Sequence, residues 1–234
     1  MKTITAQYRD LLPVEVQENG ESLVYLSKMQ IACGYWKSNK DMEPFFDAKI
    51  LVRKTVAEKL QQANAYIQKK TNNRFELYVT YGYRLLDIQK RSFQKTVRDI
   101  ISQTYISDPI ELYERTHKII AVPTVAGHPT GGAVDMLLRD RQTKQWVSFG
   151  STIYDYSCTT YPTFSDKVNN KAMQNRLLLR TAMCTYGFAP FNGEWWHFSY
   201  GDREWAYYYK KPFALYAQLS VRQAKNLLVR RNKT

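Results

Sequence analysis

"GGAVDMLLRD", residues 131–140, is the segment on which the expected fold depends. Two glycines lead into an apolar run, residues 133–138, that is typical of a β-strand. Within this run the one carboxylate is Asp135. Side chains alternate between the two faces of a strand, so Asp135 shares a face with Ala133 and Leu137. A carboxylate among apolar neighbours costs free energy unless it is paired or bound to a metal. We therefore expect a strand that presents Asp135 to a polar partner.

Further strands are expected on both sides of this segment. "QWVSFGS" (145–151) could complete a hairpin with it, and "EWWHFSY" (194–200) and "WAYYYKK" (205–211) could form a second hairpin that turns at "GDRE". Two other strands are expected at "RFELYVTYGYR" (74–84) and "HKIIAVP" (117–123).

Helices are expected where apolar residues recur with helical spacing. Four segments show this spacing: 51–70, 88–105, 170–187 and 213–231. Gly187 is well placed to end the third helix, because glycine adopts the left-handed conformation that often follows a last helical turn. Hairpins mixed with long helices predict an α+β fold, a single domain whose mostly antiparallel central sheet is flanked by helices.

Composition and charge limit the classes of protein to consider. The first 22 residues lack the apolar run of a signal peptide, and no window approaches the roughly 18 apolar residues of a membrane span, so we expect a cytoplasmic protein without a membrane partner. The net charge is +13, and residues 210–234 contain basic but no acidic residues. Attraction to nucleic acid or another polyanion is one interpretation. A solvated basic surface helix is preferred, because no zinc-finger, RRM or KH motif accompanies the charge.

Histidines are scarce, which narrows the search for a reactive site. The chain contains only His117, His128 and His197. His128 lies seven residues before Asp135, and the glycines between them give the backbone the freedom to fold this histidine back over the start of the strand. His117 precedes an expected strand and is interpreted as a boundary or surface residue.

"GEWWHFSYGD" (193–202) places a carboxylate and an imidazole in the most aromatic part of the chain. A strand here fixes His197 on one face, while the Asn-Gly turn signal before Glu194 allows this carboxylate to approach the histidine from a loop. This arrangement suits a metal ligand beside a proton-transfer group.

A catalytic zinc typically takes three nitrogen or oxygen ligands and leaves a fourth position for water. His128, Asp135 and His197 could fill the three places, and Glu194 could then transfer protons. Arg84, at the end of an expected strand, is a candidate partner for an oxyanion. Each pair on its own, His-x6-Asp or Glu-x2-His, also occurs for structural reasons, so the spacing leaves a structural interpretation open.

Three segments together resemble the D-alanyl-D-alanine dipeptidases, a family of zinc peptidases. They are "YGYRLLDIQKR" (81–91), "GHPTGGAVDML" (127–137) and "GEWWHFSYGD" (193–202), and they occur in the order and with the internal spacing of the family's motifs. The resemblance extends through most of residues 70–205.

The resemblance implies one zinc per chain, bound by His128, Asp135 and His197. It implies Glu194 as general base and acid and Arg84 as the group that stabilises the transition state. The implied reaction is hydrolysis of D-Ala-D-Ala, a small cell-wall dipeptide.

The resemblance also identifies Asp155, in "GSTIYDYS", as a candidate contact for the substrate. Two positions depart from the family pattern: Ala126 replaces a serine, and Leu85 replaces a proline. The lost hydroxyl removes one substrate hydrogen bond, so a related dipeptide is a possible substrate.

The expected organisation is one zinc-peptidase domain over residues 1–234. It comprises an N-terminal helical portion (1–70), a catalytic core (71–211) and a basic C-terminal helix (212–234). Two alternatives remain open: a zinc carboxypeptidase or endopeptidase that acts on longer muropeptides, and a polyanion-binding protein. No pattern in the chain specifies an oligomeric state.

Overall fold

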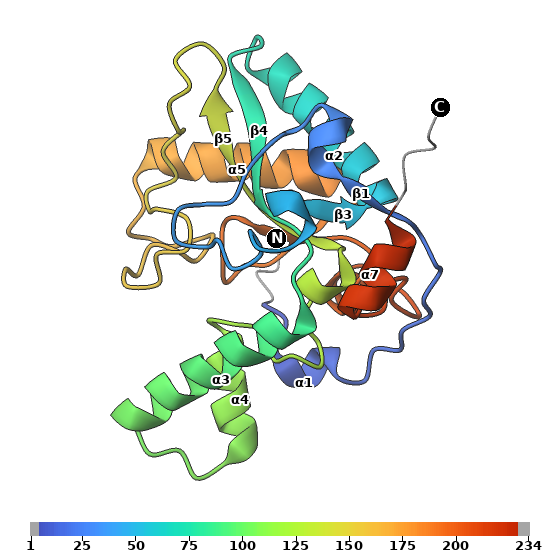
Figure 1. Ribbon diagram of the computed structural model, residues 1–234. Helices are drawn as coiled ribbons and strands as arrows, with labels where there is room; N and C mark the ends of the chain where they lie inside the picture. The colour runs from blue at the N-terminus through green and yellow to red at the C-terminus, as the bar shows by residue number, and fades with distance from the viewer. Residues whose placement is uncertain (1–4, 229–234) are drawn as a thin grey trace.

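The computed structural model describes residues 5–228, and a five-stranded sheet forms its centre (Figure 1). The strands are β1 (Leu23–Tyr25), β2 (Ala32–Cys33), β3 (Leu51–Arg53), β4 (Phe75–Tyr81), β5 (Ala133–Asp140), β6 (Ala189–Pro190) and β7 (His197–Ser199). The central order is β2-β4-β5-β7-β6, and β1 pairs with β3 in a separate two-stranded sheet. Only β2 and β4 are parallel in the central sheet of the described chain. The prediction of an α+β fold with a mostly antiparallel sheet is confirmed, and the sheet is mixed because of this one pair.

Two of the helices pack together against the sheet, and two others form a projecting pair. They are α1 (Tyr8–Leu11), α2 (Lys54–Lys70), α3 (Leu86–Gln103), α4 (Pro109–His117), α5 (Asn170–Thr185), α6 (Arg203–Tyr208) and α7 (Val221–Leu227), with short 3-10 turns η1 (Leu26–Met29), η2 (Phe46–Ala48) and η3 (His128–Thr130). Figure 1 shows α2 and α5 together on one side of β4 and β5, where they contact each other. The α3–α4 pair extends away from the end of the sheet at which β4 finishes.

The expected helix at 51–70 begins three residues later than predicted. Its apolar positions Val56, Leu60, Ala63 and Ile67 are buried, as helical spacing requires. Residues 51–53 instead form β3, which pairs with β1. A short apolar run is compatible with either element, and pairing with a distant strand decides between them. The described part of the first 70 residues therefore contains three strands as well as the helices α1 and α2, so it is not simply the helical portion that was expected.

The second half of α3 is not packed in the core. The residues that suggested this helix include Ile101, which is 50% exposed, and Tyr105, which lies beyond the helix and is 89% exposed. The buried residues of α3 are Ile88, Gln89 and Phe93, in its first half. The first half of α3 therefore packs against the body, while the second half projects from it.

Two expected strands are wrong because helix caps decide the local structure. Asp108 accepts a hydrogen bond from the N–H of Ile110 and begins α4, so the expected strand 117–123 is the end of that helix and a loop. Asp202 likewise accepts from the N–H of Trp205 and begins α6, so the expected strand 205–211 is helical at its start.

Other differences concern length. The expected strand 194–200 is shortened to β7. The expected strand 145–151 is reduced to one antiparallel bridge, between Arg139 and Trp146. Of the expected helix 213–231, only α7 forms, after a capping box at Ser220, and residues 229–231 lie outside the described part of the chain.

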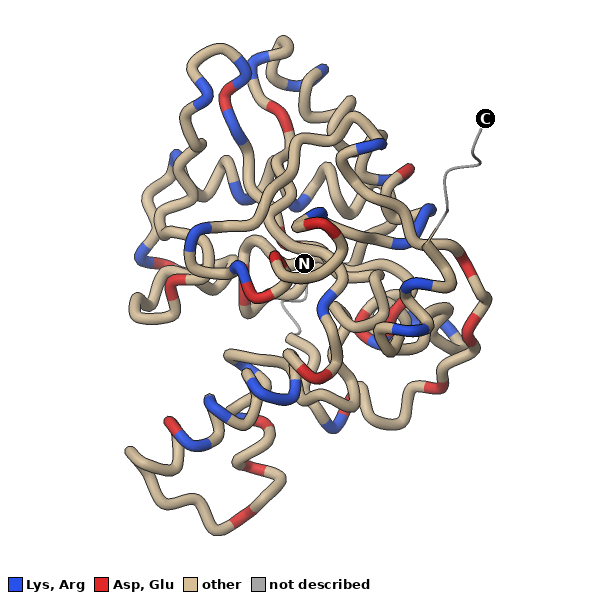
Figure 2. The backbone as a smooth tube through the Cα atoms, in the orientation of Figure 1, with Lys and Arg blue, Asp and Glu red and all other residues tan. Residues whose placement is uncertain are grey.

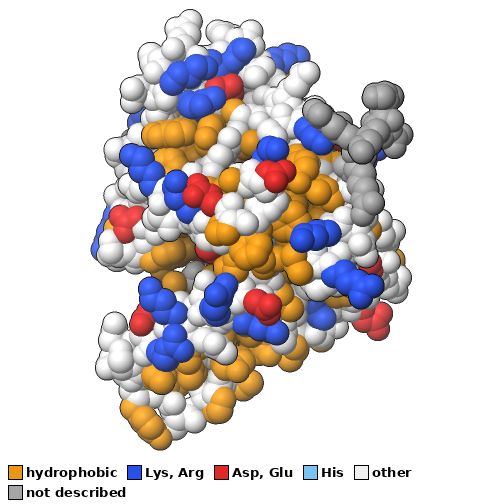
Figure 3. Space-filling model, viewed as in Figure 1, with side chains coloured by type: hydrophobic (Ala, Val, Ile, Leu, Met, Phe, Trp, Pro, Cys, Tyr) orange, Lys and Arg blue, Asp and Glu red, His pale blue; other side chains and the backbone are white. Residues whose placement is uncertain are grey.

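Basic residues are spread over the molecule. Figure 2 shows Lys and Arg along all parts of the chain, with Asp and Glu between them. On the face in Figure 3, cationic side chains are scattered around a central hydrophobic area, with a few acidic side chains among them. Among residues 5–228, no helix has both the length and the apolar character needed to cross a bilayer.

Candidate active site

The site is centred on the pairing of β5 with β7. These strands are antiparallel, and their register places Asp135 directly opposite His197. Oδ1 of Asp135 lies 2.9 Å from Nδ1 of His197. Cross-strand neighbours lie close enough for their side chains to interact, so the strand register alone brings these two residues together.

His128 reaches the same point from η3, just before β5. Its Nε2 atom lies 3.3 Å from Oδ2 of Asp135, and its Nδ1 atom is 2.8 Å from the carbonyl oxygen of Gly82. Gly131 has a φ of +75°, which ends η3 and turns the chain into the strand. A Cβ atom at Gly132 would lie 2.4 Å from the carbonyl oxygen of Tyr200, so only glycine permits this close approach.

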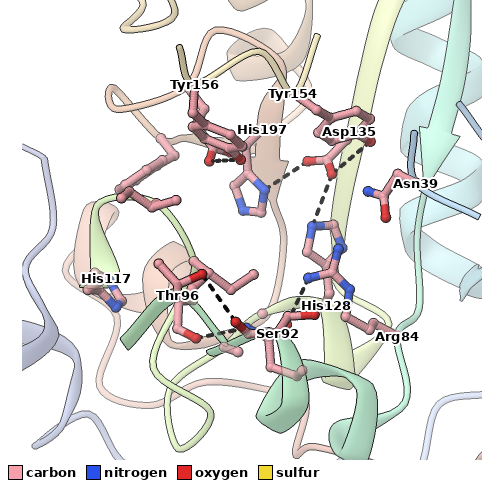
Figure 4. Close-up of a pocket in the computed structure, with 18 of the residues that line it drawn as sticks. Asn39, Arg84, Ser92, Thr96, His117, His128, Asp135, Tyr154, Tyr156 and His197 are labelled. Atoms are coloured by element: carbon pink, nitrogen blue, oxygen red, sulfur yellow. Dashed lines mark hydrogen bonds and ion pairs between the residues drawn. The ribbon is translucent and has the colours of Figure 1, made fainter. Parts of the chain in front are cut away.

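The three side chains meet the requirements of a metal site. His128, Asp135 and His197 each offer one ligand atom, and these atoms all lie within 4.8 Å of one another. Figure 4 shows both imidazoles directed toward the carboxylate. Two nitrogens and one oxygen, with a cavity beside them, match the ligand set of a catalytic zinc that keeps one position open. The residues present therefore fit this ion.

The electrostatics of the cluster favour a negative Asp135. Burial by itself would raise the pKa of this carboxyl, but charge interactions and hydrogen bonds with His128 and His197 outweigh it, and the net pKa lies well below the usual range. Burial is the largest effect on His128, and it lowers the pKa of this imidazole. Burial alone would lower the pKa of His197, but hydrogen bonds and charge interactions with Asp135 and Glu204 raise it well above the usual value. His128 is therefore already in the neutral form that binds metal, whereas His197 must release a proton to do so.

Glu194 lies at the edge of the cluster, in the loop that precedes β7. It is only 9% exposed, and its Oε1 atom accepts a 2.6 Å hydrogen bond from the hydroxyl of Tyr156. Burial raises the pKa of Glu194 to about 7, against the opposing effects of His197 and of the Tyr156 hydrogen bond. A carboxyl with a pKa near neutrality can both accept and return a proton.

Tyr154 comes from the same loop as Tyr156 and contacts Asp135, one of the three candidate ligands. Its hydroxyl donates to Oδ2 of Asp135 at 3.1 Å and lies 2.9 Å from Oγ1 of Thr80. Tyr154 has a φ of +64°, a left-handed conformation that is uncommon for a bulky side chain. Strained backbone of this kind concentrates at functional sites.

Arg84 follows β4 and is held by a buried network. Its Nε donates to the hydroxyl of Tyr81 at 3.0 Å and its Nη1 to Oε1 of Gln89 at 2.9 Å, while the Tyr81 hydroxyl in turn donates to Asp41. Burial alone would lower the pKa of Arg84, but Tyr81 and Asp41 raise it, so the side chain stays cationic. A fixed cation that lines the same cavity as Asp135 could stabilise an oxyanion there.

A cavity of about 430 Å³ connects these groups. Its walls include the three candidate metal ligands, Glu194 and Arg84, and it continues along the polar side of α3 past Ser92 and Thr96. Figure 4 shows His117 on the opposite side of the cavity from Arg84.

Asp155 is placed differently from the other predicted site residues. It does not belong to the cavity lining described above, and its Oδ1 atom accepts hydrogen bonds from the backbone N–H and the hydroxyl of Ser157. Its two neighbours, Tyr154 and Tyr156, line the cavity instead.

Three cavity residues escaped the sequence analysis. His117, which was expected at a boundary or surface, is 7% exposed, and its Nδ1 accepts the backbone N–H of Val122. Glu204 lies 3.4 Å from Nε2 of His197, but it falls in "GDRE" (201–204), which was expected to be the turn of a hairpin. Gln89 binds Arg84 from the buried side of α3. For Glu204, the helix-capping position of Asp202 was the available signal.

Comparisons with known proteins give matches over much of the chain. The Peptidase_M15 family model, described as D-ala-D-ala dipeptidase, matches residues 37–218. A D-alanyl-D-alanine dipeptidase of Synechocystis sp. (strain ATCC 27184 / PCC 6803 / Kazusa) is 29% identical over an alignment of 183 positions that covers 69% of this chain and 73% of the relative. A D-alanyl-D-alanine dipeptidase of Enterococcus faecalis (strain ATCC 700802 / V583) is 31% identical over 81 residues, 35% of this chain and 40% of the relative.

Two solved structures are also similar to the chain. The vancomycin resistance D,D-dipeptidase VanXYg, in complex with a D-Ala-D-Ala phosphinate analog, has 20% identity and a TM-score of 0.40, with 86% of this chain and 68% of that chain covered. A mutant of the vancomycin resistance D,D-pentapeptidase VanY, in complex with Zn(II), has 15% identity and a TM-score of 0.40, with 81% and 88% covered. Since the family model spans well over half of the sequence, this chain belongs to the D-alanyl-D-alanine dipeptidase family of metallopeptidases.

Proposed function

We propose that this protein hydrolyses the peptide bond of D-Ala-D-Ala, or of a closely related D,D-dipeptide, with one zinc ion per chain. The observation that carries the proposal is the convergence of Asp135, His128 and His197 on one point, in a cavity that Glu194 and Arg84 also line. Membership of the dipeptidase family supports the same reaction.

The residues have distinct roles in this proposal. His128, Asp135 and His197 hold the ion. When bound, zinc supplies Lewis-acid chemistry: it lowers the pKa of a water molecule to about 7 and polarises a carbonyl group. The donor set and the adjoining cavity agree with this role.

Glu194 moves the proton. Its carboxylate accepts a proton from the attacking water and returns it to the departing amine, which a pKa near 7 permits in both directions. The hydroxyl of Tyr156 holds Oε1 of Glu194 in place, so the other oxygen is available for this transfer. Arg84 stabilises the negative charge that develops on the carbonyl oxygen.

The two departures from the family pattern differ in consequence. Leu85 has a φ of −60°, which is the value that a proline ring imposes, so this replacement leaves the backbone conformation unchanged. Ala126 lines the cavity and offers no hydroxyl, so we propose a weaker preference for D-Ala-D-Ala over related dipeptides. Asp155 remains a proposed contact for the substrate ammonium, and it would have to turn away from Ser157 to make it.

A hydrolysis panel tests the proposal. The substrates are D-Ala-D-Ala, D-Ala-D-Ser, D-Ala-D-Lac and L-Ala-L-Ala, each with the purified protein as isolated, after treatment with a chelator, and after addition of zinc. We expect D,D-dipeptide cleavage that the chelator abolishes and zinc restores, with elemental analysis giving one zinc per chain. Cleavage that persists in zinc-free protein would contradict the proposal.

A second candidate function is the hydrolysis of longer peptides, and the length of the cavity favours it. Side chains of α3 line the cavity from Gln89, next to Arg84, to Asp99. Ten residues of helix rise about 15 Å. An extended dipeptide spans only about 7 Å. The space beyond the metal ligands could therefore hold further residues of a muropeptide.

A bulky side chain in this extension separates the two candidates. Thr96→Phe places a ring in the cavity, and Gln94→Phe places the same ring on the exposed side of α3 as a matched control. If longer peptides are substrates, T96F lowers kcat/KM for a muropeptide but not for D-Ala-D-Ala, and Q94F lowers neither. Equal effects of T96F on both substrates would leave dipeptide hydrolysis as the preferred function.

A further inference from the structure

Glu204 lies beside Nε2 of His197, the ring nitrogen that does not face Asp135. Oε2 of Glu204 lies 3.4 Å from Nε2 of His197, while Nδ1 of the same ring faces Asp135 at 2.9 Å. The two side chains are only 14% and 13% exposed, so bulk water screens their interaction weakly. His197 is thus held at both nitrogens.

The helix that carries Glu204 is firmly anchored. Asp202 caps α6 through the N–H of Trp205, and the indole Nε1 of Trp205 donates to the carbonyl oxygen of Gly187 at 3.1 Å. Trp205 is 8% exposed and Ala206 is fully buried. Glu204 is in the first turn of this helix, so the cap and the buried Trp205 fix the backbone that carries it.

His128 also has an oxygen acceptor beside the ring nitrogen that does not face Asp135, but here the acceptor is a backbone carbonyl. Its Nδ1 lies 2.8 Å from the carbonyl oxygen of Gly82, which leaves Nε2 for Asp135. Both candidate histidine ligands therefore have an oxygen acceptor on the ring nitrogen that points away from the cluster. An acceptor there fixes the tautomer and orientation of a ligating imidazole and raises its basicity.

We propose that Glu204 is a positioning residue that holds His197 as a metal ligand through Nδ1. The inference rests on the proposed function, because it takes His197 to be a ligand. In this role the carboxylate accepts the Nε2–H of His197, and the lone pair on Nδ1 faces the ion. Glu204 lines the same cavity as Glu194, so the proposal also separates the two acids: Glu194 transfers the proton, and Glu204 orients the ligand.

A zinc titration of the metal-free protein tests the role of Glu204, because it measures zinc affinity and does not depend on catalytic activity. Wild type, Glu204→Gln and a control, Glu111→Gln, are titrated with zinc against a chromophoric chelator. Glu111 is exposed on α4 and pairs with Arg115, away from the site. We expect E204Q to bind zinc about 10- to 100-fold more weakly than wild type, and E111Q to bind with wild-type affinity. Equal affinity of E204Q and wild type would overturn the proposal.

Activity at saturating zinc distinguishes positioning from proton transfer. We expect E204Q to recover most of its kcat once the site is filled, whereas E194Q stays inactive at full occupancy. A kcat for the loaded E204Q as low as that of E194Q would overturn the positioning role, because Glu204 would then act in the chemical step.

A measurement on the wild-type protein covers the case in which the variant does not fold. Long-range ¹H–¹⁵N correlation spectra of the zinc-loaded protein report which nitrogen of each histidine binds the ion. We expect Nδ1 of His197 to be coordinated and Nε2 to carry a proton. Coordination through Nε2 would overturn the proposal, whereas failure of the wild type to bind zinc at all would contradict the proposed function itself.

Discussion

Asp135 and His197 are 62 residues apart in the chain and directly opposite each other in the β5–β7 pair, with Oδ1 and Nδ1 2.9 Å apart. The pairing follows from backbone hydrogen bonds rather than from the attraction between the two side chains. A shift of the register by one residue would turn either side chain to the other face of the sheet. The relative position of these two side chains is therefore set by the pairing of β5 with β7.

Replacement of Glu194 by glutamine should abolish turnover without loss of metal. The amide preserves the size of the side chain but cannot accept the proton, so we expect kcat to fall by about 10²- to 10⁴-fold. Zinc content, measured by elemental analysis, should equal that of wild type. Normal turnover in E194Q would remove this residue from the mechanism.

Replacement of His197 by alanine should remove metal and activity together. The variant loses one of three ligands, and the buried Asp135 loses a hydrogen bond. We expect zinc content well below stoichiometric after dialysis, with E111Q as a surface control that retains it. Full zinc occupancy in H197A would contradict the ligand assignment.

Replacement of Arg84 should slow the chemical step while zinc remains bound. Loss of one group that stabilises an oxyanion typically lowers kcat by about 10²- to 10³-fold. Arg84→Lys keeps the charge but cannot keep the bonds to both Tyr81 and Gln89, so we expect it to restore only part of the rate. An R84K variant with wild-type kcat would show that the guanidinium geometry is unimportant.

The pH dependence of kcat/KM should reflect Glu194. Because the base must be ionised and its pKa is about 7, activity should rise as the pH increases through this value. The hydrogen bond from Tyr156 favours the ionised form, so Tyr156→Phe raises the pKa of Glu194 and moves the rise to higher pH. A hydrogen bond to a charged group contributes about 1.5–3 kcal/mol, which corresponds to about 1 pH unit or more.

The matched control removes a tyrosine hydroxyl at a position that does not contact Glu194. Tyr113 lies on α4 and is 36% exposed, and Tyr113→Phe should leave the pH profile unchanged. A shift of Y156F toward lower pH would show that the hydroxyl stabilises the neutral form of Glu194 instead.

Gly132→Ala should destabilise the fold at the site. The new Cβ would lie 2.4 Å from the carbonyl oxygen of Tyr200, so β5 and the end of β7 must separate. We expect the free energy of unfolding to fall by about 1–3 kcal/mol, measured by denaturant titration. Gly132 does not have the positive φ that would by itself disfavour alanine, so the predicted loss is attributed to the contact with Tyr200. A G132A variant as stable as wild type would argue against the steric explanation.

The sequence by itself predicted the candidate site residues and several of the main elements of the fold. Carboxylates and imidazoles in apolar segments are costly to bury, so Asp135, Glu194 and His197 stand out from the residues around them. The spacing of apolar residues likewise predicted α2, α5, β4 and β5, because burial of one face imposes a period that is visible in the chain.

Some secondary-structure elements and side-chain contacts depend on residues far apart in the chain, and only the tertiary structure decided these. Residues 51–53 form a strand because β1 lies beside them, and the segment after Asp202 forms a helix because its cap and buried Trp205 outweigh the strand propensity of three tyrosines. The supporting contacts of Glu204, Tyr154 and Tyr156 have no local pattern, since each of them joins loops or helices that only the folded sheet brings together. Local sequence fixes which groups can react, and the packing of elements far apart in the chain fixes which of them meet.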